Sequence, residues 1–177
     1  MEGKPLQAPW RMDYIRSLVK DDAGGGCFLC AAANATSETE KRERLVLWTT
    51  DLSVVLINRY PYTNGHLLIA PRAHVADMEA LSDAQHLDLA KQSARAIQLL
   101  KRASSPQGFN LGTNLGRVAG AGVPGHLHHH VVPRWGGDTN FMSVVGEVRV
   151  VPQAMSQLYD ELMRVQQGQG ARGEGRA

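Results

Sequence analysis

Apolar and β-branched residues gather in short runs along the first part of the chain, and turn-forming residues separate them. The runs at 45–48 and 53–58 flank a short polar turn, and this spacing predicts a β-hairpin. A third run at 66–70 follows the turn cluster at 60–65 and ends at a proline, so it predicts the next strand. Because the connections between these runs are short, we expect the strands to pair antiparallel.

The pattern then changes to the period of a helix. Ser82 is followed three residues later by Gln85, which predicts a capping box. Apolar residues at helical spacing extend this helix to about Arg102. A last helix is predicted to start at Pro152, because four apolar residues after it share one helical face. These residues are Met155, Leu158, Leu162 and Val165.

Two more strands complete the pattern, at 108–114 and at 126–132, the second ended by Pro133. The segment at 31–43 is small, polar and charged, and it indicates a loop or a weak helix. Strands, one long helix and further strands in this order predict an α+β domain. We expect an antiparallel sheet of about five strands, the average sheet size, together with the long helix and the C-terminal helix.

The length of 177 residues suits one domain. We expect residues 1–166 to form it, with residues 1–26 as an N-terminal arm. Residues 167–177 contain no apolar side chain larger than alanine, so we expect them to be a disordered tail.

Charge and hydropathy exclude several classes of function. The 19 basic and 17 acidic residues leave a net charge of +2, too small to indicate nucleic-acid binding by itself. No apolar stretch approaches the roughly 20 residues that span a bilayer, and the N-terminus lacks the features of a secretory signal. We therefore expect a cytoplasmic protein that binds neither nucleic acid nor membrane.

The informative feature is a cluster of four histidines within five residues. In a strand, His126, His128 and His130 would project from one face, and His129 from the other. Three imidazoles beside the glycine-rich segment 116–125 combine a nucleophile with backbone amides that can hold phosphate oxygens. This pattern predicts phosphoryl or nucleotidyl transfer. The alternatives are a fortuitous histidine-rich turn or a simple metal site.

The stretch at 126–132, His-Leu-His-His-His-Val-Val, resembles the signature of the histidine triad (HIT) nucleotide hydrolases and transferases. Asn-Arg-Tyr-Pro at 58–61, followed by Gly-His at 65–66, is similar to an early strand-turn-strand of that family. The segments at 9–12 and 130–141 resemble its bacterial diadenosine tetraphosphate phosphorylase or ATP adenylyltransferase-like branch. The resemblance implies the HIT-like fold.

The resemblance also implies roles for the triad. His128 would attack the α-phosphorus and become nucleotidylated, and His130 would hydrogen-bond oxygens of the phosphate or leaving group. His126 would orient the nucleophile. Asn58 matches the position that binds the ribose hydroxyls, and Asn114 matches a polar residue at the phosphate edge.

This chain departs from the family pattern at two places. His129 stands where family members usually carry an apolar residue. Gly122 and Val123 stand where a polar residue often precedes the triad, so backbone N–H groups would have to make the substrate contacts there, or these contacts are missing. His66 matches a position that we interpret as support for the site, although a buried, hydrogen-bonded histidine explains it equally well.

The pair Cys27 and Cys30 has the spacing of a metal or redox site. By resemblance to zinc-bearing HIT proteins and to galactose-1-phosphate uridylyltransferases, His74 and His126 would complete a structural zinc site. The alternatives are a buried free thiol pair and a redox pair.

The implied activity is cleavage of dinucleoside polyphosphates, such as diadenosine tetraphosphate, at the α-phosphate through a nucleotidyl-histidine. The alternatives are a phosphoramidase that releases AMP from amines and a non-enzymatic nucleotide-binding adaptor. Adenine nucleotides are the expected ligands. The resemblance further implies a homodimer or a higher homo-oligomer.

Overall fold

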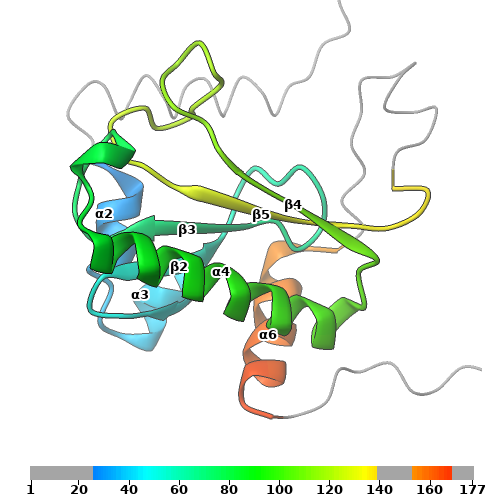
Figure 1. Cartoon of the computed structure of the whole chain (residues 1–177). Coiled ribbons are helices and arrows are strands. Elements are labelled where there is room, and N and C mark those ends of the chain that lie inside the picture. Colours follow the sequence, from blue (N-terminus) through cyan, green and yellow to red (C-terminus); the bar gives the residue numbers. More distant parts are fainter. Residues whose placement is uncertain (1–25, 139–152, 169–177) are drawn as a thin grey trace, which may run out of the picture.

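The computed structural model describes residues 26–138 and 153–168, and its centre is a five-stranded antiparallel sheet (Figure 1). The strands follow the spatial order β1-β2-β3-β5-β4. They are β1 (Val46–Thr49), β2 (Ser53–Ile57), β3 (Leu67–Pro71), β4 (Gly108–Thr113) and β5 (His129–Arg134). This confirms the α+β prediction. The predicted arm and tail lie largely outside the described residues.

Both faces of the central strands are buried, and different helices cover them. The long helix α4 (Asp83–Ser104) and the C-terminal helix α6 (Met155–Gln166) pack on one face, where Leu67 and Ile69 of β3 join their core. The short helix α2 (Phe28–Ala33) packs on the other face, against Leu68 and Ala70. In Figure 1, α4 runs along the sheet. Alternation along β3 therefore supplies two separate cores.

The predicted helices are confirmed, although α6 starts at Met155 and Pro152, its predicted start, lies outside the described residues. Ser82 and Gln85 form both hydrogen bonds of the capping box at the start of α4. The segment at 31–43, predicted to be a loop or a weak helix, holds the end of α2 and a second short helix, α3 (Glu38–Glu43). Helix α3 has its own capping box from Ser37 and Glu40, which the composition of the segment obscured. A 3-10 turn, η1 (Met78–Ala80), precedes α4.

The predicted bounds of the last strand were wrong at both ends. Strand β5 starts at His129, so His126 and His128 lie just before it, and it continues through Pro133 to Arg134. Proline is tolerated because Pro133 pairs only with Phe109 of β4. The pairing of β5 with β3 ends at Val131, so the missing N–H of Pro133 removes no bond to β3.

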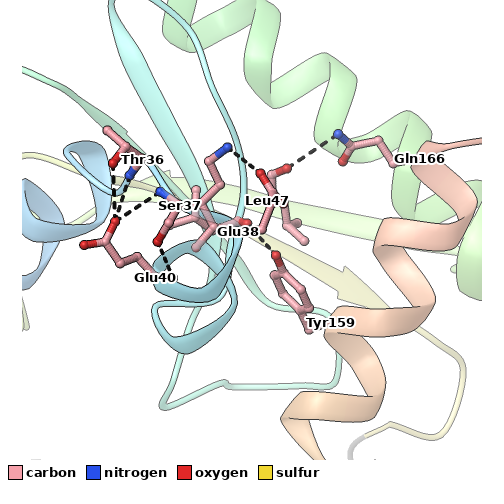
Figure 2. A network of polar contacts seen from close by, with 9 residues as sticks. Thr36, Ser37, Glu38, Glu40, Leu47, Tyr159 and Gln166 are labelled. Atoms are coloured by element: carbon pink, nitrogen blue, oxygen red, sulfur yellow. Dashed lines mark hydrogen bonds and ion pairs between the residues drawn. The ribbon is translucent and has the colours of Figure 1, made fainter.

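The edge strand β1 is covered, because α6 supplies side-chain donors to its backbone (Figure 2). The Tyr159 hydroxyl donates to the carbonyl oxygen of Val46 at 3.2 Å, and the Gln166 amide donates to that of Leu47 at 3.5 Å. Arg42 of α3 forms an ion pair with Asp160 of α6, so both helices are fixed at this edge. The covered edge is thereby protected from pairing with another strand.

Within the two ranges that the structure describes, no helix combines the length and the apolar character needed to cross a membrane.

The turn before β3 depends on a glycine. Gly65 has a φ of +78°, and a Cβ built there would lie 3.1 Å from Leu100 and 3.2 Å from Pro133. The left-handed backbone and the close approach both require glycine. The turn in consequence sets the position of His66, the next residue.

We predict that Gly65→Ala lowers the free energy of unfolding by about 2–3 kcal/mol, from the strained backbone and the added contact. Chemical denaturation followed by circular dichroism measures the change. Gly108→Ala is the matched control, because a Cβ at Gly108 meets nothing within 4 Å and its φ is not positive. Equal effects of the two substitutions would contradict this account of Gly65.

Candidate active site

Three histidines gather where the chain enters β5. Leu127 and Val131 point into the core beneath α4. His130 pairs across the sheet with Leu68, whose side chain packs on the opposite face. The predicted alternation thus separates the histidines from the α4 side, although the first two precede the strand. The rings of His128 and His130 lie edge to face with centroids 5.0 Å apart.

The backbone determines the tautomer of His128. Its Nδ1 atom lies 2.8 Å from the carbonyl oxygen of His126. A carbonyl oxygen only accepts, so Nδ1 carries the hydrogen and Nε2 carries the lone pair. Burial lowers the pKa of His128, although the bond to His126 opposes the shift, so the ring is neutral near pH 7. A neutral imidazole with an unprotonated Nε2 is a competent nucleophile.

A second backbone group determines the tautomers of His66 and His130. The backbone N–H of Tyr62 donates to Nδ1 of His66 at 3.1 Å, so the hydrogen of His66 is on Nε2. That Nε2 lies 2.9 Å from Nδ1 of His130 and donates to it. The hydrogen of His130 must then be on its own Nε2. The tautomer of His66 therefore determines the tautomer of His130.

The Nε2–H group of His130 is the unsatisfied end of this series. The atom is buried and has no hydrogen-bond partner among residues 26–138 and 153–168. Burial, with the neighbouring imidazoles of His128 and His129, lowers the pKa of His130 to about 4, which keeps the ring neutral. A buried donor without a partner is costly unless a ligand satisfies it. An anionic oxygen is the natural acceptor.

Asn58 lies at the same end of the site. Its side-chain nitrogen is 3.2 Å from Nδ1 of His66, and its side-chain oxygen accepts the backbone N–H of Tyr60 at 3.0 Å. The turn that follows β2 is therefore built around this amide. The structure brings Asn58 next to the series of histidines.

Asn114 lies in the glycine-rich loop after β4. Its amide donates to the carbonyl oxygen of Gly120 at 3.4 Å, so it closes the loop upon itself. Gly122 and Val123 are half-buried, and the carbonyl oxygen of Val123 accepts the backbone N–H of His126. The loop thereby leads directly into the triad.

Four potential metal ligands form a second cluster beside the triad. Cys27 is the N-cap of α2 and Cys30 lies in its first turn, so their thiols share one side of the helix. His74 follows β3, and His126 is fully buried. One ligand atom from each of the four lies within 4.8 Å of the other three. Three segments far apart in sequence meet here.

The geometry of this cluster fits a tetrahedral ion. Nδ1 of His126 lies 3.2 Å from Sγ of Cys27 and 3.4 Å from Sγ of Cys30, and Nδ1 of His74 lies 3.2 Å from Sγ of Cys30. The corresponding edge of a zinc tetrahedron, from its usual bond lengths, is about 3.6 Å. These residues can hold a metal ion with small adjustments.

The protonation states of His126 and the two cysteines also fit a metal site. Nε2 of His126 lies 2.8 Å from the carbonyl oxygen of Pro71, so Nε2 carries the hydrogen and Nδ1 is left to ligate. Burial and the neighbouring Cys27 thiol raise the pKa of Cys30 to about 11. A divalent cation would supply the positive charge that two adjacent thiolates require.

Sequence reasoning placed Tyr62 only in a turn, yet it touches the site twice. Its backbone N–H orients His66, and its ring lies against the rings of His66 and His130. An aromatic residue four positions before a candidate histidine is a weak signal in sequence. By contrast, His86 lies in the first turn of α4 and His129 begins β5, apart from the triad face.

The sequence of the chain is similar to a family model and to several characterised proteins. Residues 39–137 match the model of the HIT domain. An AP-4-A phosphorylase from Mycobacterium tuberculosis is 38% identical over 151 residues, which cover 85% of this chain and 77% of that protein. An adenosine 5'-monophosphoramidase from Schizosaccharomyces pombe is 32% identical over 85 residues, which cover 48% of this chain and 60% of that protein.

Solved structures agree on the fold. A Zn-bound histidine triad family protein from Mycobacterium smegmatis matches with a TM-score of 0.60 and 22% identity, covering 81% of this chain and 98% of that one.

Proposed function

Because the chain belongs to the HIT family, we propose that it cleaves dinucleoside polyphosphates at the α-phosphorus through a nucleotidyl group on His128. The observation that carries the proposal is the bond from Nδ1–H of His128 to the carbonyl oxygen of His126, which leaves Nε2 as the nucleophile. The similarity to an AP-4-A phosphorylase supports diadenosine tetraphosphate as substrate and inorganic phosphate as acceptor.

The reaction has two halves. Nε2 of His128 attacks the α-phosphorus, a P–N bond forms, and the bond to the bridging oxygen breaks, so that diadenosine tetraphosphate releases ATP. An oxygen of inorganic phosphate then attacks the same phosphorus, breaks the P–N bond and releases ADP. Water in place of phosphate would release AMP. His128 is restored at the end of either route.

The other site residues stabilise charge and position the nucleotide. Nε2–H of His130 donates to an oxygen of the phosphate or leaving group, where negative charge increases during bond breaking. Asn58 binds the ribose hydroxyls, and Asn114 lies at the phosphate edge. Backbone N–H groups of Gly122 and Val123 replace the side chain that usually binds phosphate there. His126 positions His128 through its carbonyl group.

The metal site, in this proposal, holds zinc through Cys27, Cys30, His74 and His126. Two thiolates and two imidazoles are a ligand set typical of structural zinc, which stabilises the fold and leaves no position open for substrate. His126 is common to both centres, because its side chain is a ligand and its carbonyl oxygen holds His128. The site thus joins α2 to the segment that carries the nucleophile.

We also propose that two copies pair through β4. Among residues 26–138 and 153–168, no further strand lies beside this edge strand, and Leu111 is 54% exposed within it. Side chains of α6 cover the opposite edge. An exposed strand that pairs with its own copy about a two-fold axis satisfies its free backbone groups and buries this leucine.

For the reaction, diadenosine tetraphosphate should yield equal amounts of ATP and ADP when phosphate is present, as measured by chromatography. His128→Ala should lower turnover at least about a thousandfold by removing the nucleophile. His86→Ala, outside the site, is the control and should keep full activity. Turnover retained by His128→Ala would overturn the mechanism. Preferential release of AMP from an adenosine phosphoramidate would indicate the alternative phosphoramidase activity.

For the metal, elemental analysis of the purified protein should find one zinc per chain. Cys30→Ser and His74→Ala should lower this content and the melting temperature, because each removes a ligand. His86→Ala should change neither. A wild-type protein purified in the presence of zinc but free of metal would rule out the site.

For the dimer, sedimentation equilibrium should find the wild-type chain as a dimer or a larger even-numbered assembly. Leu111→Asp should shift it toward monomer by placing a charge in the buried interface. Leu87→Asp is the matched control, since Leu87 is 56% exposed but belongs to helix α4 and not to the strand proposed to pair. A monomeric wild type, or dissociation by both substitutions, would contradict pairing through β4.

A further inference from the structure

The imidazole of His130 is held on three sides. His66 donates to its Nδ1 at 2.9 Å, and the ring of His128 lies against it at a 66° angle. The ring of Tyr62 lies nearly parallel to that of His130 in an offset stack, with centroids 5.8 Å apart and planes 21° apart. Tyr62 also contacts His66, at a centroid distance of 4.7 Å. Four rings, those of Tyr62, His66, His128 and His130, therefore form one packed group at the site.

These contacts restrict different motions. The hydrogen bond at Nδ1 fixes one end of the ring but lets the plane rock about the axis of that bond. A nearly parallel neighbour restricts rocking, because an offset stack is lost when the planes diverge. The direction of Nε2–H depends on that plane. Tyr62 is therefore placed to control where the unsatisfied donor points.

We propose that Tyr62 is a positioning residue that holds the imidazole of His130 in the plane in which Nε2–H meets the substrate phosphate. It acts through its ring, which stacks on His130, and its backbone N–H separately fixes the tautomer of His66. This inference rests on the proposed function for its kinetic consequence. The orientation of the ring itself is independent of any substrate.

The environment of Tyr62 suits such a role. Its side chain is 43% exposed, so the contact with His130 is made by a ring that is only partly covered. A residue needed only for stability would be expected deeper in the core. His66, which the ring of Tyr62 contacts, is in contrast fully buried.

The test compares Tyr62→Phe, which keeps the ring, with Tyr62→Leu and Tyr62→Val, which remove it. With diadenosine tetraphosphate and phosphate, the aliphatic variants should lower kcat about three- to tenfold, the range set by one aromatic pair, and change KM less than twofold. Tyr62→Phe, which keeps the aromatic ring, should retain the wild-type kcat. Loss of activity in Tyr62→Phe equal to that in Tyr62→Leu would assign the effect to the hydroxyl and overturn the proposal.

A double-mutant cycle with His130→Ala tests whether the effect passes through His130. Tyr62→Leu should lower kcat in the wild-type background and have no further effect in His130→Ala. An equal loss in both backgrounds would show that Tyr62 acts on the substrate directly. Melting temperatures of all variants, measured in parallel, identify any loss that comes from unfolding.

Nuclear magnetic resonance supplies a readout without turnover. Long-range proton–nitrogen correlation should show His130 as the Nε2–H tautomer in the wild type and in Tyr62→Phe. In Tyr62→Leu its ring should show exchange broadening, while His66 keeps its tautomer. Unchanged His130 signals in Tyr62→Leu would overturn the proposal. If the wild type turned over no nucleotide, the proposed function would fail and this comparison would still decide the role of Tyr62.

Discussion

The hydrogen bond from Nδ1–H of His128 to the carbonyl oxygen of His126 is the interaction on which the site depends. It determines which nitrogen of a buried, neutral imidazole carries the lone pair. The oxygen that accepts it belongs to a residue whose own ring is fixed, at Nε2 by the carbonyl of Pro71 and at Nδ1 beside the two thiols. The ring of His128, the proposed nucleophile, is thus oriented by a backbone carbonyl group and not by an acidic side chain.

A backbone group also determines the tautomer of His130, on the other side of the triad. A backbone N–H cannot accept a hydrogen bond, so the amide of Tyr62 determines the tautomer of His66 and, through it, that of His130. His128 is thereby left with a lone pair and His130 with a donor, although the two residues are chemically identical and two positions apart. This asymmetry is what nucleophilic attack followed by stabilisation of charge requires.

Much of the fold could be predicted from the sequence. The hairpin and the strand that ends at Pro71 are continuous apolar runs between turns, and the helix from Ser82 has a capping box and a 3.6-residue period. The order of these elements gives the α+β class. The errors have physical causes as well. Strand β5 can run through Pro133 because its pairing with β3 stops at Val131, so the proline faces only β4. The pairing of the strands decides this, and the sequence around the proline does not show it. Helix α3 was obscured because a short charged helix buries no side chain and shows no apolar stripe.

The sequence by itself determined the family, because the triad and the segments around it are contiguous motifs that resemble the HIT family, and it supplied the candidate site residues. Only the tertiary structure decided which nitrogen of each histidine carries hydrogen and that Tyr62 stacks on His130. It also showed that the ligand atoms of Cys27, Cys30, His74 and His126 lie within 4.8 Å of one another. The reason is physical: tautomers and ligand geometry are set by atoms up to 99 residues away along the chain, as between Cys27 and His126. No local pattern carries that information.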